Sequence, residues 1–168
     1  MARRTIFVLA LGLVVSTLGL AGCGSERGPQ TLRVEPGGAS IGETVARARP
    51  GDIVLIAPGT YQESVRVDRR GITIRGEDRN TVVLDGQDRL TNGFLVAADG
   101  VAIENLTVHN FTQNGIVFNG AERASRGRGI DPDTAYGSGT DVLDGYAARF
   151  VTAYNNGLYG IYAFASRN

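Results

Sequence analysis

The sequence has no lysine and no tryptophan, and it has one cysteine and one histidine. A single cysteine excludes a disulfide framework, and a single histidine, His109, excludes a multi-histidine copper or zinc site within the chain. All the cationic residues are arginine, and 17 of them face 17 acidic residues, so the formal net charge is zero. Nucleic-acid-binding proteins carry a basic stripe or patch, so this balance predicts no nucleic-acid partner.

Long apolar runs are also scarce, and the one that exists lies at the N-terminus. Residues 6–20 carry no charge and follow Arg3 and Arg4; they are too few for a comfortable membrane span but have the length of a signal-peptide core. The run ends in small residues directly before Cys23. This arrangement resembles a bacterial lipoprotein signal; the alternative is an ordinary secretory signal followed by an incidental cysteine.

The lipoprotein signal predicts where the protein resides. It implies that residues 1–22 are removed and that Cys23 is lipidated, which anchors the chain to the extracytoplasmic face of a bacterial cell membrane. Residues 23–30 contain Gly, Ser and Pro and show no apolar periodicity. We therefore expect a flexible tether there, leading into a domain at residues 31–168.

One short helix is predicted at residues 40–49. Ser40 and Glu43 have the spacing of a capping box, and Pro50-Gly51 ends the helical stretch that follows them. A helix of about two turns is unstable by itself, so we expect it to pack against the domain.

From Asp52 onward the apolar residues fall into short packets, several with the period-two alternation of strands. Gly, Asn, Asp and Arg separate them. The packets are Ile53–Ile56, Val65–Val67, Ile72–Ile74, Val82–Leu84, Phe94–Val96, Val101–Ile103, Leu106–Val108, Ile116–Phe118, Phe150–Val151 and Ile161–Phe164.

The packets recur at fixed offsets, which indicates a solenoid. Residues 64–74 match residues 93–103 at an offset of 29, and Gly93-Phe94 matches Gly115-Ile116 at an offset of 22. A third match pairs residues 106–116 with residues 151–161 at an offset of 45, which is about one 22-residue turn with additional residues. We interpret the Gly-, Arg- and Asp-rich stretch 122–140 as those additional residues, a loop inserted into one coil.

A repeat of this length with three short strands predicts an all-β fold, a right-handed parallel β-helix solenoid, with the short helix capping its first coil. An antiparallel sandwich is the alternative. It requires hairpin turns, and few of the packets are joined by two residues.

The stretch after the predicted helix carries a family resemblance. Residues 48–61, with PGD, an apolar strand and PGTY, resemble the opening of the pectin-lyase-like family of right-handed β-helix proteins. Residues 71–76, 84–86 and 103–108 resemble its later coils. The family includes polysaccharide lyases, hydrolases and epimerases, and a periplasmic accessory protein for maturation of a metalloenzyme, so the resemblance implies the fold without selecting one function.

The last packet lies close to the end of the sequence. Ile161–Phe164 is followed by four residues, whereas a solenoid needs a polar or covering terminal repeat. We expect the 168 residues to be a fragment with further coils beyond Asn168; the alternative is a partner that covers the last coil.

Candidate catalytic and metal-binding groups are few. Lyases of the resembled architecture hold Ca²⁺ with acidic residues, and hydrolases use paired carboxylates. Asp131 and Asp133 could offer oxygen ligands to Ca²⁺, but Asp and Pro also favour turns. We expect His109 at a turn and the asparagines at strand ends to adopt left-handed backbone and bond between coils. The candidate carboxylates are Asp85, Asp88, Asp99, Glu104, Asp131, Asp133, Asp141 and Asp144.

The aromatic residues gather towards the end of the chain. Seven of the twelve lie between residues 136 and 164. Aromatic rings stack on sugars, and the predicted substrate-binding residues, beside the inserted loop, are Tyr136, Tyr146, Tyr154 and Tyr159. In the alternative, Phe150 and Phe164 belong to the core and the tyrosines stack between coils.

Together these features predict a membrane-anchored β-helix protein with a carbohydrate-binding or carbohydrate-processing role and a polysaccharide partner. The alternatives are a polysaccharide lyase, epimerase or hydrolase whose catalytic coils lie beyond the chain end, and a periplasmic accessory factor for metalloenzyme maturation. The residues by themselves favour neither an enzyme nor a binding protein.

Overall fold

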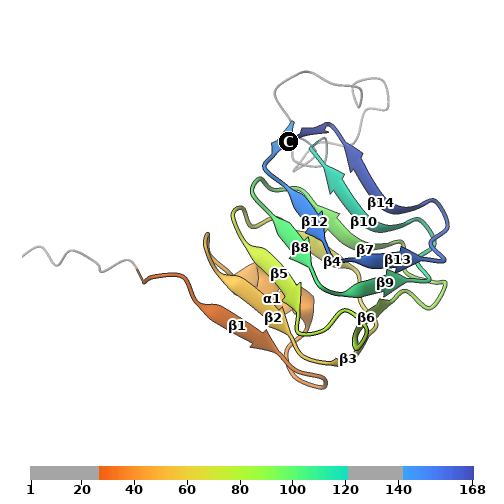
Figure 1. Ribbon diagram of the computed structural model, residues 1–168, viewed down its shortest axis with the longest axis horizontal. Helices are drawn as coiled ribbons and strands as arrows, with labels where there is room; N and C mark the ends of the chain where they lie inside the picture. Colours follow the sequence, from red (N-terminus) through yellow and green to blue (C-terminus); the bar gives the residue numbers. More distant parts are fainter. Residues whose placement is uncertain (1–26, 121–141) are drawn as a thin grey trace, which may run out of the picture.

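The computed structural model describes residues 27–120 and 142–168 (Figure 1). The strands form three main sheets in which every neighbouring pair is parallel, and the chain visits the three sheets in turn. Each circuit is one coil of a right-handed parallel β-helix, as predicted, because connections between parallel strands of one sheet are almost always right-handed. The predicted signal peptide, Cys23 and the inserted loop 122–140 lie outside the described residues.

The three sheets are named A, B and C. Sheet A contains β1 (Thr31–Val34), β2 (Ile53–Ile56), β5 (Thr73–Gly76), β8 (Ala102–Glu104) and β12 (Ala147–Arg149). Sheet B contains β3 (Gly59–Tyr61), β6 (Val82–Asp85), β9 (Thr107–His109) and β13 (Thr152–Tyr154). Sheet C contains β4 (Val65–Val67), β7 (Asn92–Val96), β10 (Asn114–Asn119) and β14 (Tyr159–Phe164).

Coils 1 to 4 are the successive strand sets β2–β3–β4, β5–β6–β7, β8–β9–β10 and β12–β13–β14. Two short strands accompany coil 4, since β11 (Leu143–Asp144) pairs in parallel with β15 (Ser166–Arg167). The coils stack so that each sheet grows by one strand per coil (Figure 1).

The strand registers confirm the predicted offsets. Val65 is the Cα partner of Phe94, Phe94 of Ile116, and Ile116 of Ile161. Val65, Phe94 and Ile116 are at most 1% exposed, whereas Ile161 on coil 4 is 46% exposed. Each coil therefore buries its inward side chains against the coils next to it, which is the main source of stability in a solenoid.

A column of glycines is required where the chain enters sheet C. A Cβ on Gly93 would lie 2.5 Å from the carbonyl oxygen of Gly115, and a Cβ on Gly115 would lie 2.6 Å from that of Gly160. These positions are the ones that the sequence repeats place in register. Close approach of backbone to backbone between coils explains why glycine recurs there.

Helix α1 (Ile41–Arg47) caps the first coil, as predicted. Ser40 accepts a hydrogen bond from the Glu43 nitrogen, and the Glu43 side chain accepts one from the Ser40 nitrogen, which completes the capping box. The Glu63 carboxylate accepts bonds from the Ile41 and Gly42 nitrogens, at 2.8 and 3.1 Å, and so ties the helix to coil 1. Within the described ranges no helix is both long and apolar enough to cross a bilayer.

The last residues of the predicted tether contact the body of the protein through Asp52. This carboxylate is 2% exposed and accepts hydrogen bonds from the nitrogens of Arg49 and Gln30 and from the Arg27 guanidinium, at 2.9, 2.8 and 2.6 Å. The bonds from Arg49 and Gln30, followed by that from Arg27, lower the pKa of Asp52 below its ordinary value. Residues 27–30 are thus held against the start of coil 1.

Asparagines turn the chain at several corners, as predicted. Asn105, Asn110 and Asn155 have φ of 57°, 58° and 50°, in the left-handed region. Asn105 donates to the carbonyl oxygens of Gly76 and Glu77 on the coil below, at 2.9 and 3.0 Å. Side-chain bonds between coils therefore help to fix the corners.

The predicted strand at Phe150–Val151 is wrong. β12 ends at Arg149 and β13 begins at Thr152, so Phe150 lies at the corner between them, with φ of 53° and 73% of its surface exposed. The alternative that placed Phe150 in the core is wrong for the same reason. At this corner the Phe150 side chain lies in solvent rather than in the core.

Candidate functional site

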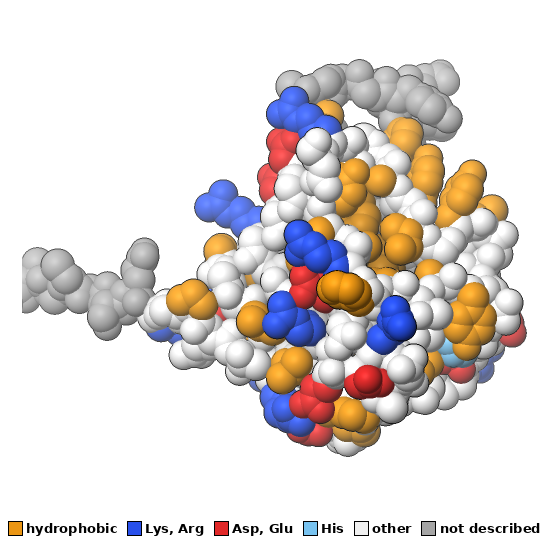
Figure 2. Space-filling view, viewed as in Figure 1, with side chains coloured by type: hydrophobic (Ala, Val, Ile, Leu, Met, Phe, Trp, Pro, Cys, Tyr) orange, Lys and Arg blue, Asp and Glu red, His pale blue; other side chains and the backbone are white. Residues whose placement is uncertain are grey.

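Exposed apolar side chains gather on coil 4. The described residues with a large exposed apolar side chain are Phe150, Tyr154, Leu158, Tyr159, Ile161 and Tyr162. Figure 2 shows such side chains over the end of the molecule that carries coil 4. A concentration of exposed apolar surface on one part of a protein marks a candidate interaction site.

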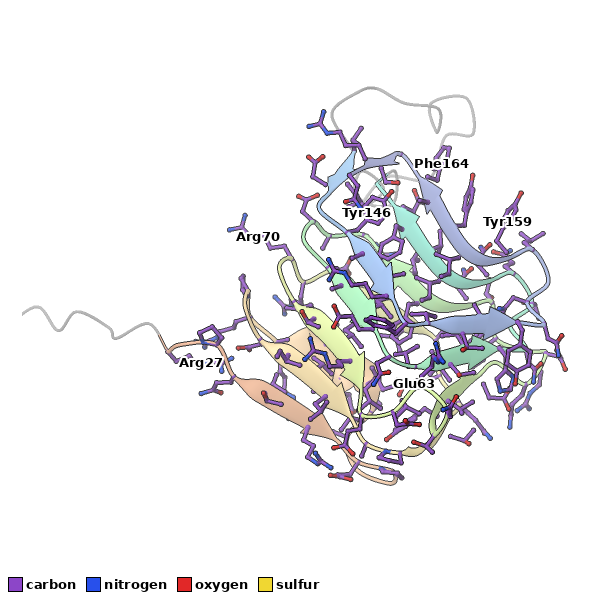
Figure 3. All side chains as sticks on the ribbon, viewed as in Figure 1. Arg27, Glu63, Arg70, Tyr146, Tyr159 and Phe164 are labelled. Carbon is purple, nitrogen blue, oxygen red and sulfur yellow. The ribbon has the colours of Figure 1, made fainter. Side chains whose placement is uncertain are left out.

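Three aromatic side chains form a row along β14, here called the aromatic row: Tyr159, Tyr162 and Phe164. The Tyr159 and Tyr162 ring centroids are 4.9 Å apart with an interplanar angle of 15°, and those of Tyr162 and Phe164 are 6.3 Å apart at 16°. Tyr159 is 54% exposed and Tyr162 is 37% exposed, whereas Phe164 is half-buried. Figure 3 shows Tyr159 and Phe164 projecting from opposite ends of the same strand.

The rings are spaced more widely than rings in full face-to-face contact. Such rings have planes about 3.5–4 Å apart, whereas the centroids in the row are 4.9 and 6.3 Å apart. On the neighbouring strands the Cα partners of Tyr162 are Val117 and, beyond it, Leu95. The aromatic row is therefore the exposed margin of an apolar strip across sheet C.

Tyr154 lies on sheet B rather than in this row. Its ring stacks on His109 of the coil below, with centroids 4.8 Å apart and an interplanar angle of 19°. Asp85, one coil lower, places Oδ1 3.6 Å from His109 Nδ1, which is buried and makes no hydrogen bond within the described residues. Tyr154, His109 and Asp85 thus stack along the coil axis, and the imidazole supports the tyrosine ring.

His109 was expected at a turn, but it is the last residue of β9. The strand extends one residue beyond its apolar packet because His109 pairs with Asp85 and Tyr154 in register. Position in the ladder, rather than side-chain polarity, determines where this strand ends.

Tyr146 is placed in the interior of coil 4. Its ring packs on Phe118, with centroids 4.6 Å apart, and its hydroxyl accepts a hydrogen bond from Ser166 at 3.4 Å. The four predicted binding tyrosines are therefore not one cluster: Tyr146 packs inward, Tyr154 lies on sheet B, Tyr159 lies in the aromatic row, and Tyr136 is outside the described residues.

Of the five candidate carboxylates in the described ranges, Glu104, Asp85 and Asp144 are bonded to other side chains, Asp99 accepts a bond from the Asp144 nitrogen, and Asp88 is exposed. Glu104 accepts hydrogen bonds from Arg75 and Arg149 on the coils either side, and the bond from Arg75, with that from Arg149, lowers the pKa of Glu104. Asp85 accepts from the Gln87 nitrogen and from Asn110, and Asp144 pairs with Arg167. These hydrogen bonds and ion pairs give Glu104, Asp85 and Asp144 a structural role.

The calcium prediction concerns residues that the structure does not describe. Asp131, Asp133 and Asp141 lie outside residues 27–120 and 142–168. Within those ranges no group of three or more His, Cys, Asp or Glu side chains is arranged to hold a metal ion. The calcium site therefore stays a prediction.

The sheets define the class of protein: a right-handed parallel β-helix. No family model and no curated protein matches the chain. Among solved structures, a crystal structure of a pectin methylesterase variant in complex with a hexasaccharide matches with a TM-score of 0.45 and 18% sequence identity. The match covers 80% of this chain and 47% of that chain, so this chain spans less than half of its length.

Proposed function

We propose that the protein is a β-helix anchored at the extracytoplasmic face of a bacterial membrane and that it binds a polysaccharide through the aromatic row. The observation that carries the proposal is the geometry of Tyr159, Tyr162 and Phe164: nearly parallel rings, with successive centroids 4.9 and 6.3 Å apart, on one strand. The prediction that tyrosines near the end of the chain bind a carbohydrate is kept here for Tyr159, and Tyr162 and Phe164 join it.

The chemistry of sugar rings suits this surface. A pyranose ring has an apolar face of C–H groups, and aromatic faces bind such groups by dispersion and by the hydrophobic effect. The row runs from Tyr159 to Phe164, and its first and last ring centroids lie at most about 11 Å apart, because the two successive centroid distances are 4.9 and 6.3 Å. That length favours an extended sugar chain over a single sugar as the ligand.

Anchoring is supported by the sequence. A short basic start, an apolar run at residues 6–20 and small residues before Cys23 are the features of a lipoprotein signal. Lipidation of Cys23 would keep the binding surface outside the cytoplasm, where polysaccharides of the cell envelope lie.

Binding rather than catalysis is proposed because of how three of the candidate carboxylates are bonded. Glu104 is shared by two arginines, and the Asp85 and Asp144 carboxylates are hydrogen-bonded or ion-paired. A general acid or base must be able to reach substrate with a labile proton. The aromatic row needs no such group.

The proposal is tested by measuring affinity for a panel of soluble polysaccharides, neutral and acidic, by affinity electrophoresis and calorimetry. For the polysaccharide that binds, the double variant Tyr159→Ala/Tyr162→Ala should bind about 10- to 100-fold more weakly, which corresponds to roughly 0.7–1.4 kcal/mol per ring. Tyr162→Phe, which keeps the ring, should retain most of the affinity.

Leu158→Ala is the matched control, because Leu158 is 62% exposed beside the row and has no ring. It should leave affinity unchanged, and circular dichroism should show the same fold for all variants. Absence of binding to every member of the panel, or an equal loss in Leu158→Ala and in the tyrosine variants, would contradict the proposal.

A further inference from the structure

The corner that leads into sheet A repeats a glycine turn before every coil. Gly51, Gly71, Gly100 and Gly145 all have positive φ, between 65° and 89°. The Gly51 nitrogen donates to the Gly71 carbonyl at 2.6 Å, and the Gly100 nitrogen donates to the Asp144 carbonyl at 2.9 Å. The glycines therefore form a continuous column along the coil axis. The residues that precede one glycine lie beside the residues that precede the glycine of the next coil.

The charge of this column changes along its length. Before Gly51 and Gly71 the chain has Arg49, Arg69 and Arg70, whereas before Gly100 and Gly145 it has Asp99 and Asp144. Arg47, in the last turn of α1, adds a further cation two residues from Arg49. The basic corner is defined here as Arg47, Arg49, Arg69 and Arg70.

These four arginines are exposed, and none has an acidic partner among the described residues. Of the nearby acidic groups, Asp52 pairs with Arg27 and Asp68 pairs with Arg66, while the Asp99 carboxylate, on the next coil of the column, accepts a hydrogen bond from the Asp144 nitrogen. Exposed arginines with no carboxylate bonded to them suit an anionic partner.

The tether reaches the body at the same corner. Arg27 and Gln30 bond to Asp52, which directly follows Gly51. A Cβ on Gly51 would lie 3.1 Å from Cγ of Pro29, so the tether packs directly on the turn. Figure 3 shows Arg27 and Arg70 on the same side of the molecule.

The length of the tether limits how far this corner can be from the anchor. Arg27 is the fourth residue after Cys23, and four residues of extended chain span at most about 14 Å. A lipid at Cys23 would therefore bring the basic corner to the level of the phospholipid headgroups.

We propose that the basic corner binds the headgroups of anionic phospholipids and thereby orients the β-helix on the membrane. This inference rests on the proposed anchoring. Coulombic attraction between exposed arginines and an anionic leaflet acts within about one Debye length, roughly 8 Å at physiological salt. Coil 4 and the aromatic row, at the other end of the coil stack, then face away from the membrane (Figure 1).

The test uses the full protein purified from membranes and placed on vesicles of phosphatidylcholine, with or without about 30% phosphatidylglycerol. Phenylglyoxal modifies exposed arginines, and mass spectrometry gives the modified fraction at each one. On anionic vesicles the modification of Arg69 and Arg70 should fall about three-fold or more and should recover at about 0.5 M NaCl. Arg79 and Arg89, both exposed and remote from the corner, are internal controls and should not change.

A pair of variants removes the charge. Arg69→Gln/Arg70→Gln should abolish the difference between the two vesicle types at Arg47 and Arg49, whereas Arg79→Gln/Arg89→Gln should leave it unchanged. Equal modification of the corner arginines on both vesicle types overturns the inference. Protection of these arginines that does not change when salt is added overturns it as well.

Vesicle flotation separates this inference from the anchoring. A protein that fails to float with phosphatidylcholine vesicles but floats with anionic ones, with its corner protected, lacks the anchor and keeps the headgroup site. A protein that floats with both and shows no protection of the corner keeps the anchor and lacks the site.

Discussion

Phe150 occupies on coil 4 the corner position that Asn105 occupies on coil 3. Arg149 and Glu104 are Cα partners, and the residue after each has left-handed backbone, with φ of 53° for Phe150 and 57° for Asn105. Asn105 uses its side chain to bond the coil below, whereas Phe150 is 73% exposed. The two residues thus share a backbone conformation that suits one of them far better.

Replacing Phe150→Asn should therefore stabilise the protein by about 1 kcal/mol, because Asn tolerates left-handed backbone and phenylalanine does not. Urea denaturation followed by circular dichroism measures the change. Phe150→Ala is the control: it removes the same exposed ring but keeps an unfavourable residue at the corner. Equal stability of the Asn and Ala variants would show that the corner backbone is not strained by Phe150.

Gly115→Ala should destabilise the protein by about 2–3 kcal/mol. The new Cβ would lie 2.6 Å from the Gly160 carbonyl oxygen and 2.9 Å from Asn156 Nδ2, so the coils would have to move apart. Gly28→Ala, where no atom lies within 4 Å of the new Cβ, should change stability by less than about 0.5 kcal/mol. Thermal melts of both variants measure their stabilities. A Gly115→Ala variant as stable as Gly28→Ala would contradict the close stacking of coils 3 and 4.

Acid should weaken the protein through Glu104. Its pKa is lowered from 4.5, first by the bond from Arg75 and then by that from Arg149. A carboxyl group with a lowered folded-state pKa stabilises the fold above its unfolded pKa, and that stabilisation is lost as the pH falls through the folded pKa. Glu104→Gln should therefore cost about 1 kcal/mol at pH 7, since both arginines are partly exposed and screened.

The difference between wild type and Glu104→Gln should shrink below the ordinary pKa of 4.5. Denaturation midpoints at pH 7 and at about pH 3 measure it. Asp88→Asn, at an exposed carboxylate, is the control and should leave both midpoints close to those of wild type. A cost for Glu104→Gln that is the same at both pH values would mean that the bonds do not depend on its charge.

Cys23→Ser should release the protein from membranes, because serine has no thiol to accept a lipid. Membrane and soluble fractions, together with incorporation of labelled fatty acid, measure the change. Cys23 is the only cysteine, so any loss of label assigns the site without ambiguity. Label retained in the serine variant would reject lipidation at this residue.

The coil architecture could be predicted because the inward-facing apolar residues recur in the sequence at regular offsets. Val65, Phe94 and Ile116 are all apolar, and they pair as predicted. The strands β3 and β12 could not be found in this way, since Gly59–Tyr61 and Ala147–Arg149 contain no apolar packet. Their neighbours in the stack, rather than their own side chains, hold them extended.

The candidate site was predicted in part. Tyr159 was predicted to bind substrate, but Tyr162 and Phe164 were assigned only to a strand. The signal was present in the alternation of that strand, where Ile161 and Ala163 pair with buried Ile116 and Phe118. Tyr162 lies between them and Phe164 follows at the same spacing, so strand alternation turns both outward, whereas Tyr159 has the parity of Ile161 and alternation does not account for its place in the row. The packing of Tyr146 on Phe118 could not be foreseen, because it depends on how the chain enters coil 4.

The central claim is that the coils stack parallel and in register, because this places Tyr159, Tyr162 and Phe164 on one strand beside Val117. Nuclear Overhauser spectroscopy of the isotope-labelled protein tests it most directly. Ala102 should show backbone contacts to both Thr73 and Ala147, its Cα partners 29 and 45 residues away. Contacts between strands that follow each other in the chain, such as Ala102–Glu104 running antiparallel to Thr107–His109, would contradict the account.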